Sequence, residues 1–146
     1  MKRSLNDVTA MRANLERAVR QESAAGIVSA YLFGSQVAGR SHSESDVDVA
    51  VLLRFDTYPT ARARFEERIR LSSLLPAVAG GVAVDVVVLN DCPPGFARRV
   101  VTEGDRFYCS DPEADHAFVR DVQLRAADLA PFLKRMRQLK LGAIVR

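Results

Sequence analysis

The sequence has few residues that bind zinc and no apolar run long enough to cross a membrane. It contains two cysteines, Cys92 and Cys109, and two histidines. Two cysteines without CxxC spacing argue against a zinc site and are typical of reduced thiols. The N-terminal segment alternates charged and apolar residues, whereas a secretory signal has a continuous apolar core. We therefore expect a cytoplasmic protein with no membrane partner.

The chain also has little excess charge and no internal repeat or low-complexity linker. Its formal net charge of +3 is too small to indicate a nucleic-acid binder by itself. The densest positive stretch runs from Lys134 to Arg146, and a solvated helix face is its simplest explanation. A chain of 146 residues can bury roughly two thirds of its unfolded surface around one core. We therefore expect one domain over residues 1–146.

Segments with helical and strand-like periodicity alternate along the chain, which predicts an α/β (α+β) fold. The predicted helices cover residues 6–23, a segment entered at Pro59, residues 96–103 and a C-terminal helix that begins at Asp111-Pro112. The predicted strands cover residues 27–33, 47–53, 82–90 and 106–109. The near-continuous valines of the third strand predict a central strand covered on both faces. We expect a small mixed sheet of three to four strands covered by helices.

Apolar side chains at helical spacing predict which face of each helix packs inward. The predicted inward positions are Val8, Met11, Leu15, Ala18 and Val19 in the first helix, Phe65, Ile69, Leu71, Leu74 and Leu75 in the second, and Phe118, Val122, Ala126, Leu129, Leu133 and Met136 in the last. The aromatic side chains predicted as core are Tyr31, Phe33, Phe65, Phe107 and Tyr108. Pro131 should kink the last helix or end it, because its ring clashes with the carbonyl four residues earlier.

Three aspartates stand where carboxylates from two strands can meet. Asp46 and Asp48 are two residues apart, so strand alternation puts both on one face and the intervening valines on the other. Asp85 lies inside the valine run, where a buried and unpaired carboxylate would be costly. If the two strands are neighbours, the three carboxylates can share divalent cations, and oxygen ligands of this kind suit Mg²⁺ or Mn²⁺.

Gly34 and Ser35 follow the first predicted strand as a turn, and residues 36–39 can form a short helix. Backbone N–H groups at such a strand-to-helix turn carry partial positive charge and bind phosphate oxygens. A glycine at position 34 lets a phosphate approach the backbone closely, and Ser35 adds a hydroxyl. The sequence thus predicts a phosphate site followed by metal-binding carboxylates.

The stretch GSQVAGRSHSESDVD, from Gly34 to Asp48, together with Asp85, resembles the signature of the DNA polymerase β nucleotidyltransferase superfamily. The VVVLND end of the third strand, the proline pair after it and the segment RRVVTEGDRFYCSD resemble the minimal nucleotidyltransferase branch. That branch includes antitoxins paired with HEPN-domain toxins. The resemblance covers about residues 26–112, the expected catalytic core. At one position the chain differs: Ala38 stands where the branch has an arginine, and Arg40 lies two positions later.

The resemblance implies a role for each residue of the motif. The implied metal ligands, holding two Mg²⁺ ions with Mn²⁺ as the alternative, are Asp46, Asp48 and Asp85. The implied residues for binding ATP are Gly34, Ser35, Gly39, Arg40 and Ser45, the last having local capping as its simpler role. In two-metal chemistry, one ion lowers the pKa of the attacking hydroxyl and the other stabilises the departing pyrophosphate.

Other uses of two aspartates separated by one residue fit the sequence less well. An EF-hand loop needs polar residues and a glycine between its ligands, whereas this segment is a valine-rich strand. A Walker-type NTPase is excluded because no GxxxxGK[ST] motif is present. An aspartyl phosphatase would leave the preceding Gly-Ser turn unexplained.

The predicted catalytic core covers nearly the whole chain, so we expect another protein to supply the acceptor. The family resemblance implies that the chain transfers AMP from ATP to the hydroxyl of a tyrosine in a HEPN-type toxin. It also implies that the chain acts as the antitoxin of that toxin, in an assembly of the two proteins. One alternative is a nucleotidyltransferase-fold module that neutralises its partner by docking alone, although the intact carboxylates weigh against it. A second alternative is an adenylyltransferase for an antibiotic or sugar, with a homodimer completing the acceptor site.

Overall fold

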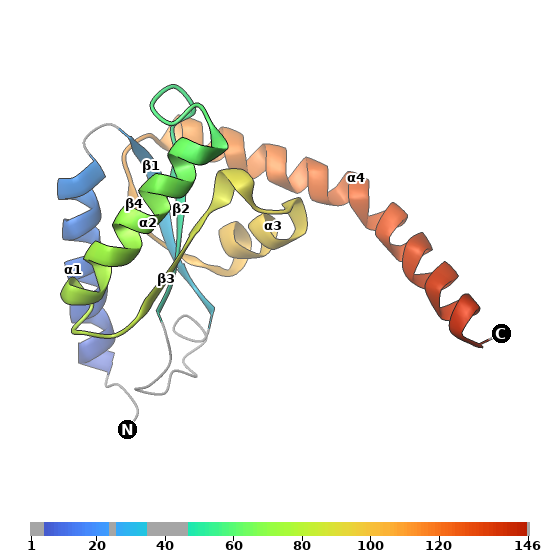
Figure 1. Ribbon diagram of the computed structural model, residues 1–146, viewed down its shortest axis with the longest axis horizontal. Helices are drawn as coiled ribbons and strands as arrows, with labels where there is room; N and C mark the ends of the chain where they lie inside the picture. The colour runs from blue at the N-terminus through green and yellow to red at the C-terminus, as the bar shows by residue number, and fades with distance from the viewer. Residues whose placement is uncertain (1–4, 24–25, 35–46, 146) are drawn as a thin grey trace.

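The computed structural model of the protein describes residues 5–23, 26–34 and 47–145. Helices pack on both faces of one sheet (Figure 1). The strands are β1 (Ile27–Phe33), β2 (Val47–Leu53), β3 (Val84–Val88) and β4 (Asp105–Cys109). The helices are α1 (Leu5–Ser23), α2 (Ala61–Val78), α3 (Pro94–Glu103) and α4 (Pro112–Val145), with a short 3₁₀ helix, η2 (Leu89–Asp91), after β3. The element types and order agree with the sequence prediction.

The four strands form a mixed sheet in the order β3-β2-β1-β4. β1 pairs antiparallel with β2 and with β4, whereas β2 and β3 run parallel. The prediction of β3 as a central strand is therefore wrong, because β3 lies at an edge of the sheet. Its valines at positions 84, 86 and 88 are buried, but Asp85 between them is exposed. The valine run thus reflects one fully buried face, while on the other face Val87 is only partly buried.

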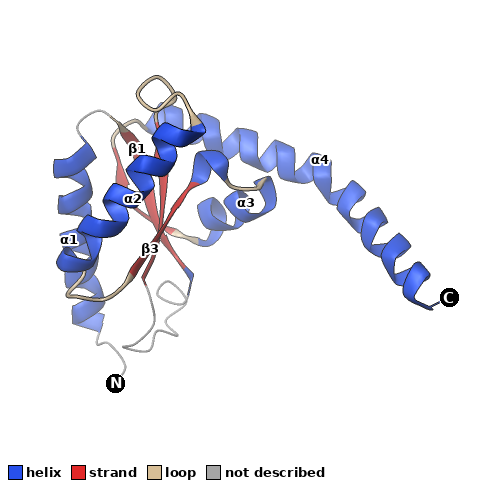
Figure 2. Ribbon diagram, in the orientation of Figure 1, coloured by secondary structure: helices blue, strands red, loops and turns tan. Residues whose placement is uncertain are grey.

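Helices cover the two faces of the sheet in separate layers (Figure 2). α1 and α2 pack on one face, where Leu15, Leu71 and Leu75 join the odd-numbered residues of β2 in a core. α3 and α4 pack on the other, where Val100 and Val122 join Ala50 and Leu52 of β2. Since side chains alternate along a strand, Asp48 lies on the same face as Ala50 and Leu52. The sheet side covered by α3 and α4 therefore carries Asp48.

The inward face predicted for α1 is confirmed, whereas that of α2 is partly wrong. In α1, Met11, Leu15 and Val19 are buried. In α2, only Leu71 and Leu75 of the five predicted side chains are buried, and the exposed ones are Phe65, Ile69 and Leu74. The helix contacts the sheet along one narrow face, so the additional apolar residues lie outside it. Of the other predicted core aromatics, Tyr31, Phe107 and Tyr108 are buried and Phe33 is half-buried.

α4 begins as predicted and then extends past the rest of the described structure. Asp111 accepts a hydrogen bond from the Ala114 backbone N–H at 3.1 Å, which is the expected N-cap. Pro131 does not end the helix, and Figure 1 shows α4 bending on its way to the C-terminus. The predicted buried stripe is wrong beyond Ala126, because Leu129, Leu133 and Met136 are exposed. Within the described residues, none of the helices is both long and apolar enough to cross a membrane.

A buried hydrogen-bond network attaches the start of α4 to the sheet. The carboxylate of Asp115, only 1% exposed, accepts hydrogen bonds from the hydroxyls of Ser29 and Tyr31, both at 2.6 Å. It also forms an ion pair with Arg106 at 2.8 Å. Burial and the adjacent Asp115 carboxylate raise the pKa of Tyr31, so its hydroxyl stays protonated and remains a donor. A buried carboxylate is tolerated here because three donors surround it.

Replacing Asp115 with alanine should destabilise the protein strongly. The change leaves two buried hydroxyls without their acceptor and Arg106 without its partner, so the free energy of unfolding should fall by roughly 3–5 kcal/mol. Asp121→Ala removes an exposed carboxylate paired with Arg125 on the same helix and should cost less than about 1 kcal/mol. Urea unfolding of both variants measures the difference, and equal losses would contradict a structural role for the network.

Candidate active site

Asp48 and Asp85 lie directly opposite each other on neighbouring strands. They are Cα partners in the parallel ladder of β2 and β3, and neighbouring strands are about 4.8 Å apart. Partners in a parallel ladder have side chains on the same face of the sheet. The two carboxylates predicted from separate parts of the sequence are therefore brought together.

Asn90 maintains this register just beyond the end of β3. Its side-chain oxygen accepts a hydrogen bond from the Leu53 backbone N–H at 2.9 Å, and its amide nitrogen donates to the Leu53 carbonyl at 2.8 Å. The side chain thus continues the pairing of β2 with β3 where the strand itself has ended. On the outer side of β3, Arg68 of α2 donates a hydrogen bond to the Val86 carbonyl at 2.6 Å. Sequence reasoning assigned no role to either residue, because both roles depend on strand neighbours.

Gly34 lies against the carboxylate of Asp48. Phe33, the last residue of β1, is the Cα partner of Asp48 in the ladder of β1 and β2. Its ring contacts that of Phe96 in α3 edge-on, with 5.7 Å between centroids. Gly34 follows with a φ of +79°, and a Cβ at this position would overlap with Oδ2 of Asp48. A glycine is therefore required here for two reasons: the left-handed backbone conformation and the close approach of the carboxylate.

The accessibility of the two carboxylates differs from the sequence prediction. Asp85 was expected to be buried among valines, but it is exposed, and Asp48 is half-buried. The edge position of β3 explains the difference, since among the described residues no further strand pairs with its outer side. Both carboxylates can consequently be reached from solvent.

The remaining predicted site residues, Asp46, Ser35, Gly39, Arg40 and Ser45, lie outside the described residues. In the part of the chain that is described, no three His, Cys, Asp or Glu side chains are grouped closely enough to hold a metal ion. Asp48 and Asp85 nevertheless fit a hard cation such as Mg²⁺. They offer oxygen donors from two strands at one accessible place, where the missing Cβ of Gly34 makes room for the Asp48 carboxylate.

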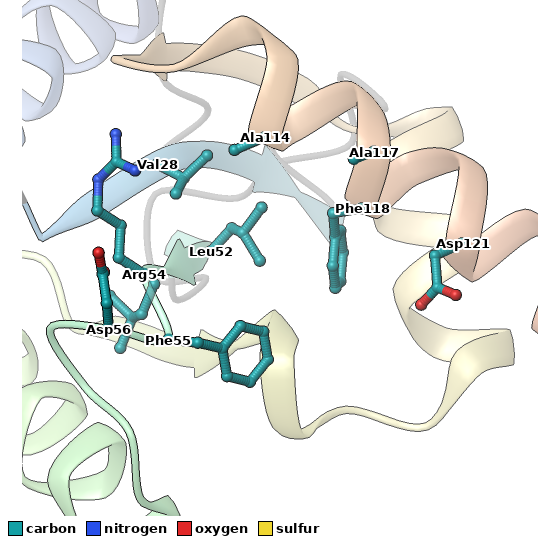
Figure 3. A pocket seen from close by; sticks show the side chains of 10 residues that line it. Val28, Leu52, Arg54, Phe55, Asp56, Ala114, Ala117, Phe118 and Asp121 are labelled. Carbon is teal, nitrogen blue, oxygen red and sulfur yellow. The ribbon is translucent and has the colours of Figure 1, made fainter.

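Apart from the two carboxylates, a hollow lies at the other end of β2, between that strand and α4. It has a volume of about 480 Å³, and Figure 3 shows the side chains of Leu52, Phe55 and Phe118 around it. The charged residues at its margin include Arg54, which is paired with Asp111 at 3.0 Å. Its walls are mainly apolar and it is remote along β2 from Asp48, so the arrangement provides no constellation for group transfer.

Neither thiol nor imidazole offers a rival catalytic group among the described residues. Cys92 and Cys109 are free and half-buried. Burial, followed by the adjacent Asp91, raises the pKa of Cys92, which disfavours the reactive thiolate. The imidazole of His116 is exposed on the outside of α4. The chemistry of the described structure thus centres on the two aspartates.

Comparisons with known proteins match the chain to a family model and to a curated relative. Residues 14–113 match the family model described as "Polymerase beta, Nucleotidyltransferase". A curated relative, the protein adenylyltransferase MntA of Shewanella oneidensis, is 32% identical over 94 residues. That alignment covers 64% of this chain and 63% of the relative, so the match spans less than two thirds of the relative's length.

Several solved structures with a similar fold are described as toxin–antitoxin complexes. One is a toxin–antitoxin crystal structure with AMP-PNP, similar at a TM-score of 0.63 and 24% identity over 92% of this chain and 98% of that one. Another contains a tri-AMPylated Shewanella oneidensis HEPN toxin and its MNT antitoxin, with a TM-score of 0.59, 22% identity, and coverage of 93% and 99% of the two chains. At these identities the structures establish the fold alone.

Replacing Gly34 with alanine should disturb the site more than the fold. Gly80 provides a matched control, because its φ of +83° is nearly the same but a Cβ there would meet nothing within 4 Å. Both variants should lose about 1–2 kcal/mol of stability from the left-handed backbone. Only Gly34→Ala displaces Asp48, and it should weaken Mg²⁺-dependent binding of AMP-PNP roughly 10- to 100-fold. Calorimetric titration measures the affinities, and equal affinities for the two variants would refute the proposed contact.

Proposed function

The chain belongs to the polymerase β nucleotidyltransferase family, and from this we propose that it transfers AMP from ATP to a hydroxyl group of a partner protein. The observation that carries the proposal is the register of β2 and β3, which sets Asp48 opposite Asp85 on one face of the sheet. Divalent metal ions need oxygen ligands gathered in this way, and the bound ions would in turn attract a triphosphate.

In the proposed site, Asp46, Asp48 and Asp85 bind two Mg²⁺ ions, with Mn²⁺ as the alternative. Metal ions bound there would neutralise the phosphates of ATP and favour the deprotonated form of the attacking hydroxyl. The backbone of Gly34 and Ser35 holds the triphosphate, with Gly39, Arg40 and Ser45 as further contacts. The structure supports the assignment of Gly34, because this residue turns the chain beside the Asp48 carboxylate.

The proposed reaction is a displacement at the α-phosphorus of ATP. A bond forms between the acceptor oxygen and this phosphorus, while the bond from the phosphorus to the bridging oxygen of the β-phosphate breaks. Pyrophosphate leaves, and the hydroxyl proton passes to the Asp85 carboxylate. Asp85 suits this role because it is exposed on an edge strand, where the acceptor can approach.

We further propose that the acceptor is a tyrosine of a HEPN-type toxin and that the chain acts as its antitoxin. Two comparisons support this: the curated relative is a protein adenylyltransferase, and a solved complex of the same fold contains an AMPylated HEPN toxin. The open edge beside Asp85 also suits a macromolecular acceptor better than an enclosed pocket would.

Removing either described carboxylate should abolish transfer without unfolding the protein. We expect Asp48→Asn and Asp85→Asn each to slow AMP transfer by about 100-fold or more, since each removes an oxygen charge from the metal site. Asp56→Asn is the matched control, because it makes the same chemical change at an exposed residue beyond the other end of β2. The assay follows labelled ATP in the presence of Mg²⁺ and the product of the neighbouring gene.

Two outcomes of this assay would contradict the proposal. If the wild-type chain transfers no label and the Asp48 and Asp85 variants still neutralise the partner, the protein acts by docking alone. If the isolated chain adenylylates an antibiotic or sugar and leaves the protein partner unlabelled, the substrate is a small molecule. Chelation of divalent ions by EDTA should stop the transfer, and full activity in its presence would exclude the metal-dependent mechanism.

A further inference from the structure

The second half of α4 carries an apolar face that nothing in the described structure covers. We call residues 129–140 the arm; at the α-helical rise of 1.5 Å per residue they extend about 18 Å. Its large apolar side chains are all exposed, at 40% for Leu129, 55% for Phe132, 49% for Leu133, 50% for Met136 and 63% for Leu139. Five such residues close together on one stretch of helix form an exposed apolar patch, whereas single exposed apolar residues are common on protein surfaces.

The exposed residues continue the buried face of the first half of α4. Val122 and Ala126, which pack into the domain, are followed at helical spacing by Leu129, Leu133 and Met136. These three residues of the arm therefore lie on the same side of α4 that packs against the domain in the first half of the helix. We call this side of the arm its inner face. It has the composition of a helix face that packs against another protein element.

The charges of the arm are of one sign. Lys134, Arg135, Arg137 and Lys140 are exposed, and no Asp or Glu occurs between Leu129 and Val145. Basic side chains therefore flank the inner face without any acidic residue on the arm to neutralise them. A surface that complements the arm should be apolar at its centre and acidic at its margins.

The inner face and the carboxylates lie on the same side of the sheet. Asp48 shares the sheet face that α3 and α4 cover, as does its ladder partner Asp85. In Figure 1, α4 passes α3 and then bends, and the arm extends away from the sheet beyond α3. A protein that is seated on the inner face and reaches past α3 would approach the side of the sheet that carries the carboxylates.

We propose that the inner face of the arm is the docking surface for the acceptor protein, which binds through an apolar groove bordered by Asp and Glu side chains. This inference rests on the proposed function and adds how the acceptor is held near Asp48 and Asp85. Docking through a surface outside the catalytic residues gives the acceptor hydroxyl a high local concentration at the site.

Two other occupants fit the observations less well. A membrane surface binds basic amphipathic helices, but the inner face continues the side of α4 that packs on the domain, so a flat bilayer laid on it would meet the domain. A second copy of the chain would bring one basic arm against another, since four positive and no negative side chains flank the face. A partner with acidic margins satisfies both the shape and the charge.

Substitutions on the two sides of the arm test the proposal. The double variant Leu133→Glu, Met136→Glu places two carboxylates on the inner face, while Ala127→Glu, Gln138→Glu adds the same charge on the opposite side of α4. All four positions are exposed, so the domain should stay folded, which circular dichroism verifies. The inner-face variant should bind the product of the neighbouring gene at least about 30-fold more weakly than wild type. The opposite-side variant and Met136→Leu should bind as wild type does.

The results separate this proposal from the proposed function. Binding of wild type should weaken as salt rises, because basic and acidic side chains meet at the margin. Equal binding of the partner by the two double-glutamate variants would overturn the docking surface. The proposal would also fail if the inner-face changes left partner binding intact and reduced only self-association, or only binding to phosphatidylglycerol vesicles. Asp48→Asn should keep binding and lose transfer. Arm-dependent binding without any AMP transfer by wild type would support the docking surface and refute the proposed function.

Discussion

The parallel pairing of β2 with β3 is the constraint on which the site depends. Shifting β3 by one residue would turn Asp85 to the opposite face of the sheet, away from Asp48. Several contacts oppose such a shift: Val84, Val86 and Val88 are buried on the other face, and the Asn90 side chain pairs with both backbone groups of Leu53. The apolar packing of one face therefore determines where the carboxylates of the other face meet.

Much of this arrangement could be predicted from the sequence. The strands at residues 27–33 and 47–53 have the predicted bounds, because β-branched and aromatic runs there end at glycine or polar residues. The spacing of Gly34, Asp48 and Asp85 predicted the site, and the ladder confirms that the two aspartates meet. A motif of this kind is informative because its spacing encodes a turn, a strand face and a neighbouring strand together.

The wrong predictions concern the surroundings of each helix or strand, because the local sequence pattern does not determine which other elements pack against it. A valine run predicts that a strand is buried, but it cannot show that β3 lies at an edge, where Asp85 is exposed. In the same way, apolar spacing predicts an inward face for all of α4, although the residues after Ala126 extend beyond α3. For Asp46, Ser35, Gly39, Arg40 and Ser45, the proposed roles stand on the resemblance of the motif.

The direction of α4 is set far from the residues that use it. Asp115 holds the first turns of the helix to Ser29 and Tyr31 in β1 and to Arg106 in β4, while Asp111 caps its start. The hydrogen bond from the Ala114 backbone N–H, and then Arg54, lower the pKa of the Asp111 carboxyl in the folded protein. The cap therefore stabilises the helix fully above the pKa that Asp111 has in the unfolded chain, and this stabilisation is lost as the pH falls through the lowered pKa. These contacts determine which way the first half of α4 points. Because the apolar face of the arm continues that of the anchored half, the same buried hydrogen bonds determine where a docked protein would lie relative to Asp48 and Asp85.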